Sequence, residues 1–238
     1  MRIDVLTLFP QMFEPVLGSS ILKRAAQDTP QRRAPVSYHL TNIRDYTLES
    51  HGKVDQPPYG GGPGMVLQCQ PVWDAVRAVE SMDDTPARRI VMTPQGRRLD
   101  QRFVESLATR PRLLIIAGHY EGIDARVIER LEPIDRVSIG DYVVSGGELP
   151  AMVLIDAVVR LIPGVLGDET STCHESFSSG WDGLLDYPHY TRPRVWQGLE
   201  VPEVLLSGDH AKIDAWRRDQ ALQRSRRLRP DLLENTDT

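Results

Sequence analysis

The chain has 238 residues, which is enough for one large domain or two smaller ones with a substantial core. A content of 40% hydrophobic and 26% charged residues is ordinary for a globular protein in water, and no apolar run reaches the roughly 18 to 20 residues that a membrane span needs. The net charge of −5 argues against a general nucleic-acid binder. Cys69 and Cys173 lie far apart, which argues against a disulfide framework and a zinc site. We expect a cytoplasmic protein, because Asp4 interrupts the apolar N-terminal stretch and no cleavage site follows.

Short apolar strands alternate with helices through the first 162 residues. Alternating patterns predict strands, and apolar residues at helical spacing predict helices. We expect strands at residues 2–9, 36–43, 89–92, 113–117 and 135–139. We expect helices at residues 12–26 (broken near Gly18), 72–82, 101–108, 124–131 and 150–162. This alternation predicts an α/β domain with a largely parallel sheet.

The last of these helices, residues 150–162, is apolar on nearly every face, which indicates burial. Its only charged residues, Asp156 and Arg160, are four positions apart. Taken alone, that spacing favours a salt bridge on one solvent-facing stripe.

The composition changes after this helix. Residues 163–186 are rich in Gly, Ser, Thr and acidic residues without periodicity, which predicts a long flexible interdomain loop, either mobile or functional. Residues 211–226 have a helical and basic pattern. We therefore expect one domain at 1–162 and a small all-helical domain at 187–238.

Three predicted strands end in glycine-containing loops, at residues 93–96, 118–122 and 139–147. Ligands of open α/β sheets bind beyond the carboxyl ends of the strands. Convergence of three such loops therefore favours one shared binding site.

The third loop leads from a strand end through Gly146 and Gly147 to Pro150, which suits the first turn of a helix. Main-chain groups in this arrangement can surround a small polar ligand. A tight connection without a ligand is the alternative. Asp141, Tyr142 and Glu148 in the same loop keep both interpretations open.

Residues 57–65 form a Gly/Pro cluster that cannot be a helix or a central strand. The cluster is similar to a phosphate-cradling loop but lacks the Gly-Lys-Ser/Thr ending of a P-loop, which argues against nucleoside triphosphate binding. Taken alone, its composition favours a mobile surface loop.

Six motifs in this order resemble the bacterial tRNA (guanine-37-N1)-methyltransferases, a knotted family of the SPOUT class. They are PYGGGPGM (58–65), TPQG (93–96), GHYEGIDAR (118–126), SIGDYVVSGGELP (138–150), RLIPGVLG (160–167) and PHYTRP (188–193). Each motif is weak by itself, but six in order over nearly the whole chain argue strongly against chance.

The resemblance implies a deep trefoil knot in the parallel sheet and a homodimer with its active site at the subunit interface. It also implies the tRNA anticodon stem-loop as partner, S-adenosylmethionine as methyl donor and Mg²⁺ at a site that no ligand cluster in the sequence identifies. The donor pocket that it implies comprises Met92, Thr93, Pro94, Gly118, Tyr120, Glu121, Ile139, Gly140, Asp141, Tyr142, Val143, Val144, Gly146, Gly147 and Pro150.

The resemblance further implies Glu175 as general base and Arg160 as stabilising cation. N1 of neutral guanine carries a proton, so its lone pair is unavailable until a base removes that proton. Negative charge then develops toward O6, where a fixed cation lowers the barrier. His174 is a rival base, although a solvated loop histidine is its simpler interpretation.

Contacts with the tRNA are expected at Asp55, Tyr59, Lys212, Arg217 and Arg218. The last three belong to the basic segment that we expect against anticodon-stem phosphates. A merely solvated run of charge is the alternative.

Three positions depart from the family pattern. Glu175 stands where we expect aspartate, His119 where we expect arginine, and Gln56 where a second acid would follow Asp55.

Two other functions compete with this one. A knotted methyltransferase for another RNA position is disfavoured by the PYGGGPGM loop and the C-terminal domain. A non-catalytic RNA-binding protein is disfavoured by the complete donor loops, and only Glu175 speaks for it.

Overall fold

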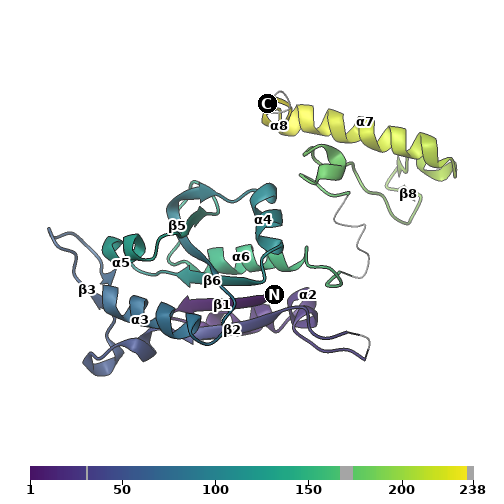
Figure 1. The fold of residues 1–238 in the computed structure, drawn as a ribbon. Helices are drawn as coiled ribbons and strands as arrows, with labels where there is room; N and C mark the ends of the chain where they lie inside the picture. The colour runs from purple at the N-terminus through teal and green to yellow at the C-terminus, as the bar shows by residue number, and fades with distance from the viewer. Residues whose placement is uncertain (31, 167–173, 235–238) are drawn as a thin grey trace. The chain divides into compact units, whose positions relative to one another are not determined.

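The computed structural model describes residues 1–30, 32–166 and 174–234, and the chain divides into two units, Met1–Gly167 and Asp168–Thr238 (Figure 1). A five-stranded sheet with the order β2-β1-β6-β5-β7 forms the centre of the first unit. Its strands are β1 (Arg2–Thr7), β2 (Ser37–Asn42), β5 (Arg88–Arg98), β6 (Arg112–Ala117) and β7 (Asp135–Ser138). Every neighbouring pair is parallel, which confirms the predicted α/β fold with a parallel sheet.

Helices connect these strands close to the predicted positions. They are α1 (Glu14–Leu17), α2 (Ser20–Ala25), α3 (Cys69–Glu80), α4 (Gln101–Ala108), α5 (Ala125–Arg130) and α6 (Glu148–Val159), with the 3-10 helices η1 (Pro10–Met12), η2 (Ile43–Tyr46) and η3 (Ser50–Gly52). The bounds of α4 match the prediction because the Asp100 carboxylate accepts a hydrogen bond from the Phe103 amide at 2.8 Å. Pro150 lies in the first turn of α6, as its missing N–H requires.

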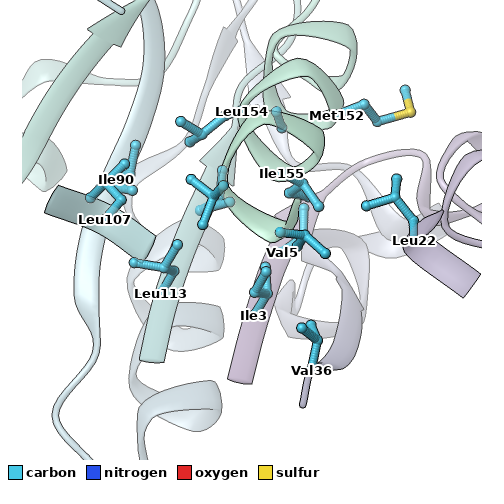
Figure 2. Close-up of a cluster of buried hydrophobic side chains, with 14 of the residues drawn as sticks. Ile3, Val5, Leu22, Val36, Ile90, Leu107, Leu113, Met152, Leu154 and Ile155 are labelled. Carbon is cyan, nitrogen blue, oxygen red and sulfur yellow. The ribbon is translucent and has the colours of Figure 1, made fainter. Parts of the chain in front are cut away.

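The two faces of the sheet are covered by different helices, which makes a three-layer arrangement. Alternate residues of one strand point to opposite faces, so Leu113 and Ile115 of β6 belong to one core and Leu114 and Ile116 to the other. Residues of α2, α4 and α6 complete the first core, and residues of α3 and α5 complete the second. Figure 2 shows side chains of α6 beside those of β1 in the first core.

A buried ion pair joins neighbouring strands where they begin. Arg112 at the start of β6 donates from Nε to the Asp4 carboxylate at 2.8 Å, and both side chains are almost completely buried. The remaining nitrogens of Arg112 donate to main-chain carbonyls, including that of Val79 at 2.6 Å. Arg2 is the second cation on Asp4. The pair is therefore fully hydrogen-bonded, as a buried charge requires.

Strand β5 and helix α6 differ from the sequence-based expectation. Strand β5 continues through residues 93–96, where a loop was expected, but its pairing with β7 shifts register between Met92 and Arg97, so these residues bulge out of the ladder. Helix α6 is not buried on every face, because Leu149 and Val153 are 51% and 50% exposed.

A short antiparallel pair was not predicted. Strands β3 (Asp55–Gln56) and β4 (Val66–Leu67) flank the Gly/Pro loop. The loop is therefore anchored at both ends.

The second unit is built on a long helix. It contains η5 (Ser179–Trp181), β8 (Val195–Trp196), β9 (Leu199–Glu200), η6 (Glu203–Leu206), α7 (His210–Leu228) and α8 (Asp231–Glu234). Trp181, Leu184 and Ala221 form its small core. The expectation of an all-helical unit is wrong in one respect, because β8 and β9 form a hairpin. Of the expected loop 163–186, residues 167–173 lie outside the described residues, and η5 occupies part of the remainder.

Within the described residues, none of the helices combines the length and the apolar character needed to cross a membrane.

Candidate active site

A pocket of about 370 Å³ lies beyond the carboxyl ends of the adjacent strands β6, β5 and β7. Its volume falls within the range of roughly 300 to 1,000 Å³ that is usual for small-molecule sites. Residues from all three glycine-containing loops line it. The loops that the sequence analysis grouped together are therefore brought together by the fold.

All the residues predicted for the donor pocket line this cavity, except Gly140 and Asp141. Asp141 points into solvent, with its side chain 91% exposed and 4.0 Å from Arg98. Gly140 has a φ of +151°, and its missing Cβ leaves room for the ring of Tyr142, which does line the cavity. Gly140 therefore supports the wall indirectly.

The sequence analysis missed several lining residues. They are Val91, Gln95, His119, Gly122, Ile123, Ile128, Arg136, Val137, Ser138 and Ser145. Most directly precede or follow predicted residues, so widening each motif by one or two positions would have found them. Ile128 lies on α5, and its apolar helical spacing carried no indication of a cavity.

The two pocket loops that carry Gly118 and Gly147 lie very close to each other. The Gly147 amide donates to the Gly118 carbonyl at 2.6 Å. A Cβ on Gly147 would lie 2.9 Å from the Cα of Ala117 and from the Gly118 nitrogen, which real side chains do not tolerate. Glycine is therefore required at position 147 for the loops to approach so closely.

Tyr120 has an unusual backbone conformation at the rim, with a φ of +60°. Its hydroxyl accepts a hydrogen bond from Nη2 of Arg44 at 3.4 Å, and Nη1 of Arg44 donates to the Gly52 carbonyl at 3.1 Å. A non-glycine residue with positive φ persists only where its surroundings hold it. Arg44 is one of the groups that hold Tyr120 at the pocket.

The Gly/Pro loop is attached directly to the pocket. The Glu121 amide donates to the Met65 carbonyl at 2.9 Å, and the Leu67 amide donates to the Gly122 carbonyl at 2.9 Å. Tyr59 near the tip of this loop is 98% exposed. Asp55, in β3, is half-buried at its base.

The helix that follows the second pocket loop begins at an ionised cap. The Asp124 carboxylate accepts hydrogen bonds from the guanidinium of Arg126 at 2.7 Å and from its amide at 3.0 Å. The hydrogen bond from the Arg126 guanidinium is the main reason why the pKa of the Asp124 carboxyl lies well below its usual range. Nearby, burial raises the pKa of the Cys69 thiol. Asp124 therefore anchors α5, which supplies Ile128 to the pocket wall.

The two predicted catalytic residues belong to different units. Arg160 is half-buried and follows the last residue of α6. Glu175 is half-buried in the second unit, where its carbonyl accepts from the Ser178 amide at 3.1 Å. The Arg160 amide donates to the Asp156 carbonyl at 3.2 Å.

The three predicted cationic tRNA contacts are engaged with acidic residues of the same unit. Lys212 lies 2.9 Å from Asp209, and Arg218 lies 3.8 Å from Asp182. Arg217 is half-buried, lies 3.2 Å from Asp214 and stacks on the ring of Tyr187. These contacts give Arg217 a role in packing the second unit, whereas Lys212 and Arg218 make only surface ion pairs.

No group of three or more His, Cys, Asp or Glu side chains that could hold a metal ion occurs within 1–30, 32–166 and 174–234.

The fold and the pocket define the class of the protein, an α/β protein with a pocket of small-molecule size at the carboxyl edge of a parallel sheet. Comparison with known proteins is more specific. Residues 1–235 match the family model described as tRNA (Guanine-1)-methyltransferase TrmD.

Relatives named tRNA (guanine-N(1)-)-methyltransferase match almost end to end. The protein of Bacillus pumilus is 52% identical over 238 residues, 100% of this chain and 94% of its own length. That of Dehalococcoides mccartyi is 53% identical over 234 residues, 98% of this chain and 91% of its own. That of Bacillus subtilis is 52% identical over 235 residues, 99% and 93% of the two chains. The chain therefore belongs to the tRNA (guanine-1)-methyltransferase family and is an enzyme of this kind.

Proposed function

We propose that the protein transfers a methyl group from S-adenosylmethionine to N1 of guanine 37 in tRNA. The observation that carries the proposal is the pocket formed by the three strand-end loops, in a chain that matches the family over nearly its full length. The donor would bind in this pocket, and the anticodon stem-loop would present the guanine to it. A deep knot, which the resemblance implies, suits the close passage of the Gly147 and Gly118 backbones.

The pocket has the chemistry that this donor needs. Apolar side chains, including Ile128, Ile139 and Val144, suit the adenine ring. Main-chain groups of the glycine-containing loops suit the polar edges of adenine and ribose, because no Cβ obstructs them. Glu121 lines the same cavity, and a carboxylate suits an ammonium group.

When bound, S-adenosylmethionine supplies an electrophilic methyl group on a positively charged sulfur. The residues of this chain prepare the acceptor. Glu175 takes the N1 proton of guanine as general base, which leaves the N1 lone pair free to form the new bond to carbon as the sulfur–carbon bond breaks. Arg160 stabilises the negative charge that develops at O6. The pocket walls align the reacting atoms, which lowers the entropic part of the barrier.

The same proposal includes a homodimer with the active site completed across its interface. Leu149 and Val153 lie one turn apart on the exposed side of α6. Met12 and Leu149 line one small cavity, so the apolar surface continues from α6 onto η1. Exposed apolar patches of this kind mark association sites. Glu175 of the partner subunit would then serve the pocket of the first subunit.

Contacts with tRNA complete the proposal. The exposed ring of Tyr59 can stack on an unpaired base, since every base offers a π-face. Lys212 and Arg218 would exchange their weak surface ion pairs for phosphates. Asp55 at the base of the Tyr59 loop would position that loop.

The assignment of the base is tested with three variants and an unmodified tRNA transcript. Glu175→Gln removes the base and should lower kcat by roughly 10²- to 10⁴-fold, the usual contribution of general base catalysis. Glu175→Asp restores the residue expected from the family and should retain activity, and His174→Gln should behave like the wild type. Full activity of Glu175→Gln together with loss in His174→Gln would assign the base to the histidine instead.

A further inference from the structure

A buried carboxylate connects the donor pocket to the first strand. Glu148, the first residue of α6, is 1% exposed. Its Oε1 accepts from the Thr7 hydroxyl at 2.8 Å, and its Oε2 lies 3.2 Å from Nδ1 of His119. The Thr7 oxygen in turn accepts from the Phe9 amide at 3.0 Å, so its single proton is directed to Glu148. Each carboxylate oxygen of Glu148 thus has a partner.

His119 belongs to the loop that lines the pocket. Its ring meets the rings of Phe9 and Tyr120 edge to face, with centroids 4.9 Å and 5.0 Å away. It borders both the large pocket and a second cavity of about 150 Å³. The imidazole therefore stands where the pocket loop meets the start of α6.

The contact between His119 and Glu148 depends on a glycine at residue 146. His119 and Gly146 face each other in an antiparallel bridge. A Cβ on Gly146 would collide with both Oε2 of Glu148 and Nδ1 of His119. The side chains of His119 and Glu148 thus occupy the space that a Cβ at residue 146 would need.

In the contact between Nδ1 of His119 and Oε2 of Glu148, an ionised carboxylate would accept and the ring nitrogen would donate. The N-terminal end of α6 favours a negative charge at this position. Arginine, the residue expected at position 119 from the family, would meet this carboxylate through a longer side chain with several donors.

We propose that Glu148 and His119 are positioning residues for donor binding, and that the hydrogen bond between them fixes the loop 118–122 against α6 in the shape that S-adenosylmethionine requires. This inference rests on the proposed function of the pocket. Neither residue needs to touch the reacting atoms, because the bond acts through the loop that carries Gly118, Tyr120 and Glu121.

Two substitutions separate the hydrogen bond from the bulk of the ring. In His119→Asn the amide nitrogen branches from Cγ as Nδ1 does, so the bond to Glu148 is kept while most of the ring is lost. In His119→Phe the ring is kept and the bond is lost. Calorimetric titration with S-adenosylmethionine should give a Kd within about threefold of the wild type for Asn and about tenfold weaker for Phe, the value of one charge-assisted hydrogen bond.

A third variant, Glu148→Gln, tests the same hydrogen bond in case His119→Phe does not fold. Glu148→Gln keeps the shape of the side chain, but it removes the negative charge and replaces one acceptor oxygen by an NH₂ group. We expect weaker donor binding and a higher KM for the donor, with the KM for tRNA unchanged. Thermal melting of each variant separates loss of fold from loss of binding.

The outcomes are distinct. Equal binding by His119→Phe and the wild type, or equal losses in His119→Asn and His119→Phe, would overturn the inference, because ring volume would then explain the site. A rise in both KM values for Glu148→Gln would overturn it too. If the wild type itself binds no S-adenosylmethionine, the proposed function fails, and the inference fails with it.

Discussion

The main-chain amide of Glu121 donates a hydrogen bond to the main-chain carbonyl of Met65 at 2.9 Å. This bond joins the Gly/Pro loop to the loop at the end of β6. The contact is possible because Gly64 has no side chain, since a Cβ there would collide with the carboxylate arm of Glu121. The Gly/Pro loop is therefore part of the pocket architecture and not an independent surface loop.

Gly64→Ala should weaken donor binding by displacing Glu121. Gly60→Ala is the matched control, since Gly60 also has a positive φ, +87° against +80° for Gly64, but a Cβ there meets nothing within 4 Å. Both variants carry the same conformational cost of about 1 kcal/mol or more. Titration with S-adenosylmethionine should show a loss of affinity for Gly64→Ala alone, and equal affinities would refute the role of the Glu121 contact.

Val153→Glu should dissociate the proposed dimer. A charge placed on the exposed apolar side of α6 would be buried without a partner in the interface, which costs several kcal/mol. Leu48→Glu serves as control, because Leu48 is fully exposed and lies outside α6. Light scattering should give half the wild-type mass for Val153→Glu only, and methyl transfer should fall with it. An unchanged mass would place the interface elsewhere.

Arg112→Met should destabilise the first unit by about 3 to 5 kcal/mol, because it leaves the buried Asp4 carboxylate without its most buried partner. Arg2 remains on Asp4, so we expect the lower end of that range. Arg110→Met, at an exposed position two residues earlier, should change the free energy of unfolding by less than about 0.5 kcal/mol. Urea unfolding monitored by circular dichroism measures both variants. Similar values for the two would mean that the buried pair contributes nothing specific.

Asp124 should make stability depend on pH in the acidic range. Its pKa in the folded protein lies below the unfolded value, so its contribution is fully present above the ordinary carboxyl pKa of about 4 and is lost as the pH falls toward the folded value. Asp124→Asn should remove this part of the acid dependence. Asp84→Asn, an exposed carboxylate, should leave it in place. Melting temperatures measured from pH 7 down to about pH 3 compare the slopes, and parallel curves for Asp124→Asn and the wild type would contradict this role.

The parallel sheet could be predicted because each strand carries its own periodicity, and α4 because Asp100 fixes its start. The exposed side of α6 could not be predicted, because a helix that is apolar all round has no polar face that shows which side meets the solvent. The β8–β9 hairpin was missed because two-residue strands are too short to show a period.

The position of the pocket could be predicted, but the contacts within it could not. Loops at the ends of parallel strands converge by topology alone, so their convergence follows from the sequence pattern. The pairing of His119 with Glu148 does not, because these residues are 29 positions apart on different elements. Only the packed structure shows that the unexpected histidine has a buried carboxylate as partner.

The most direct test of the account is the position of the transferred methyl group. Purified enzyme, labelled S-adenosylmethionine and unmodified tRNA transcripts with guanine or adenine at position 37 would be incubated, and the labelled nucleoside identified by mass spectrometry. We predict 1-methylguanosine in the guanine transcript and no label in the adenine transcript. Label at another position, or donor binding without transfer to either transcript, would contradict it.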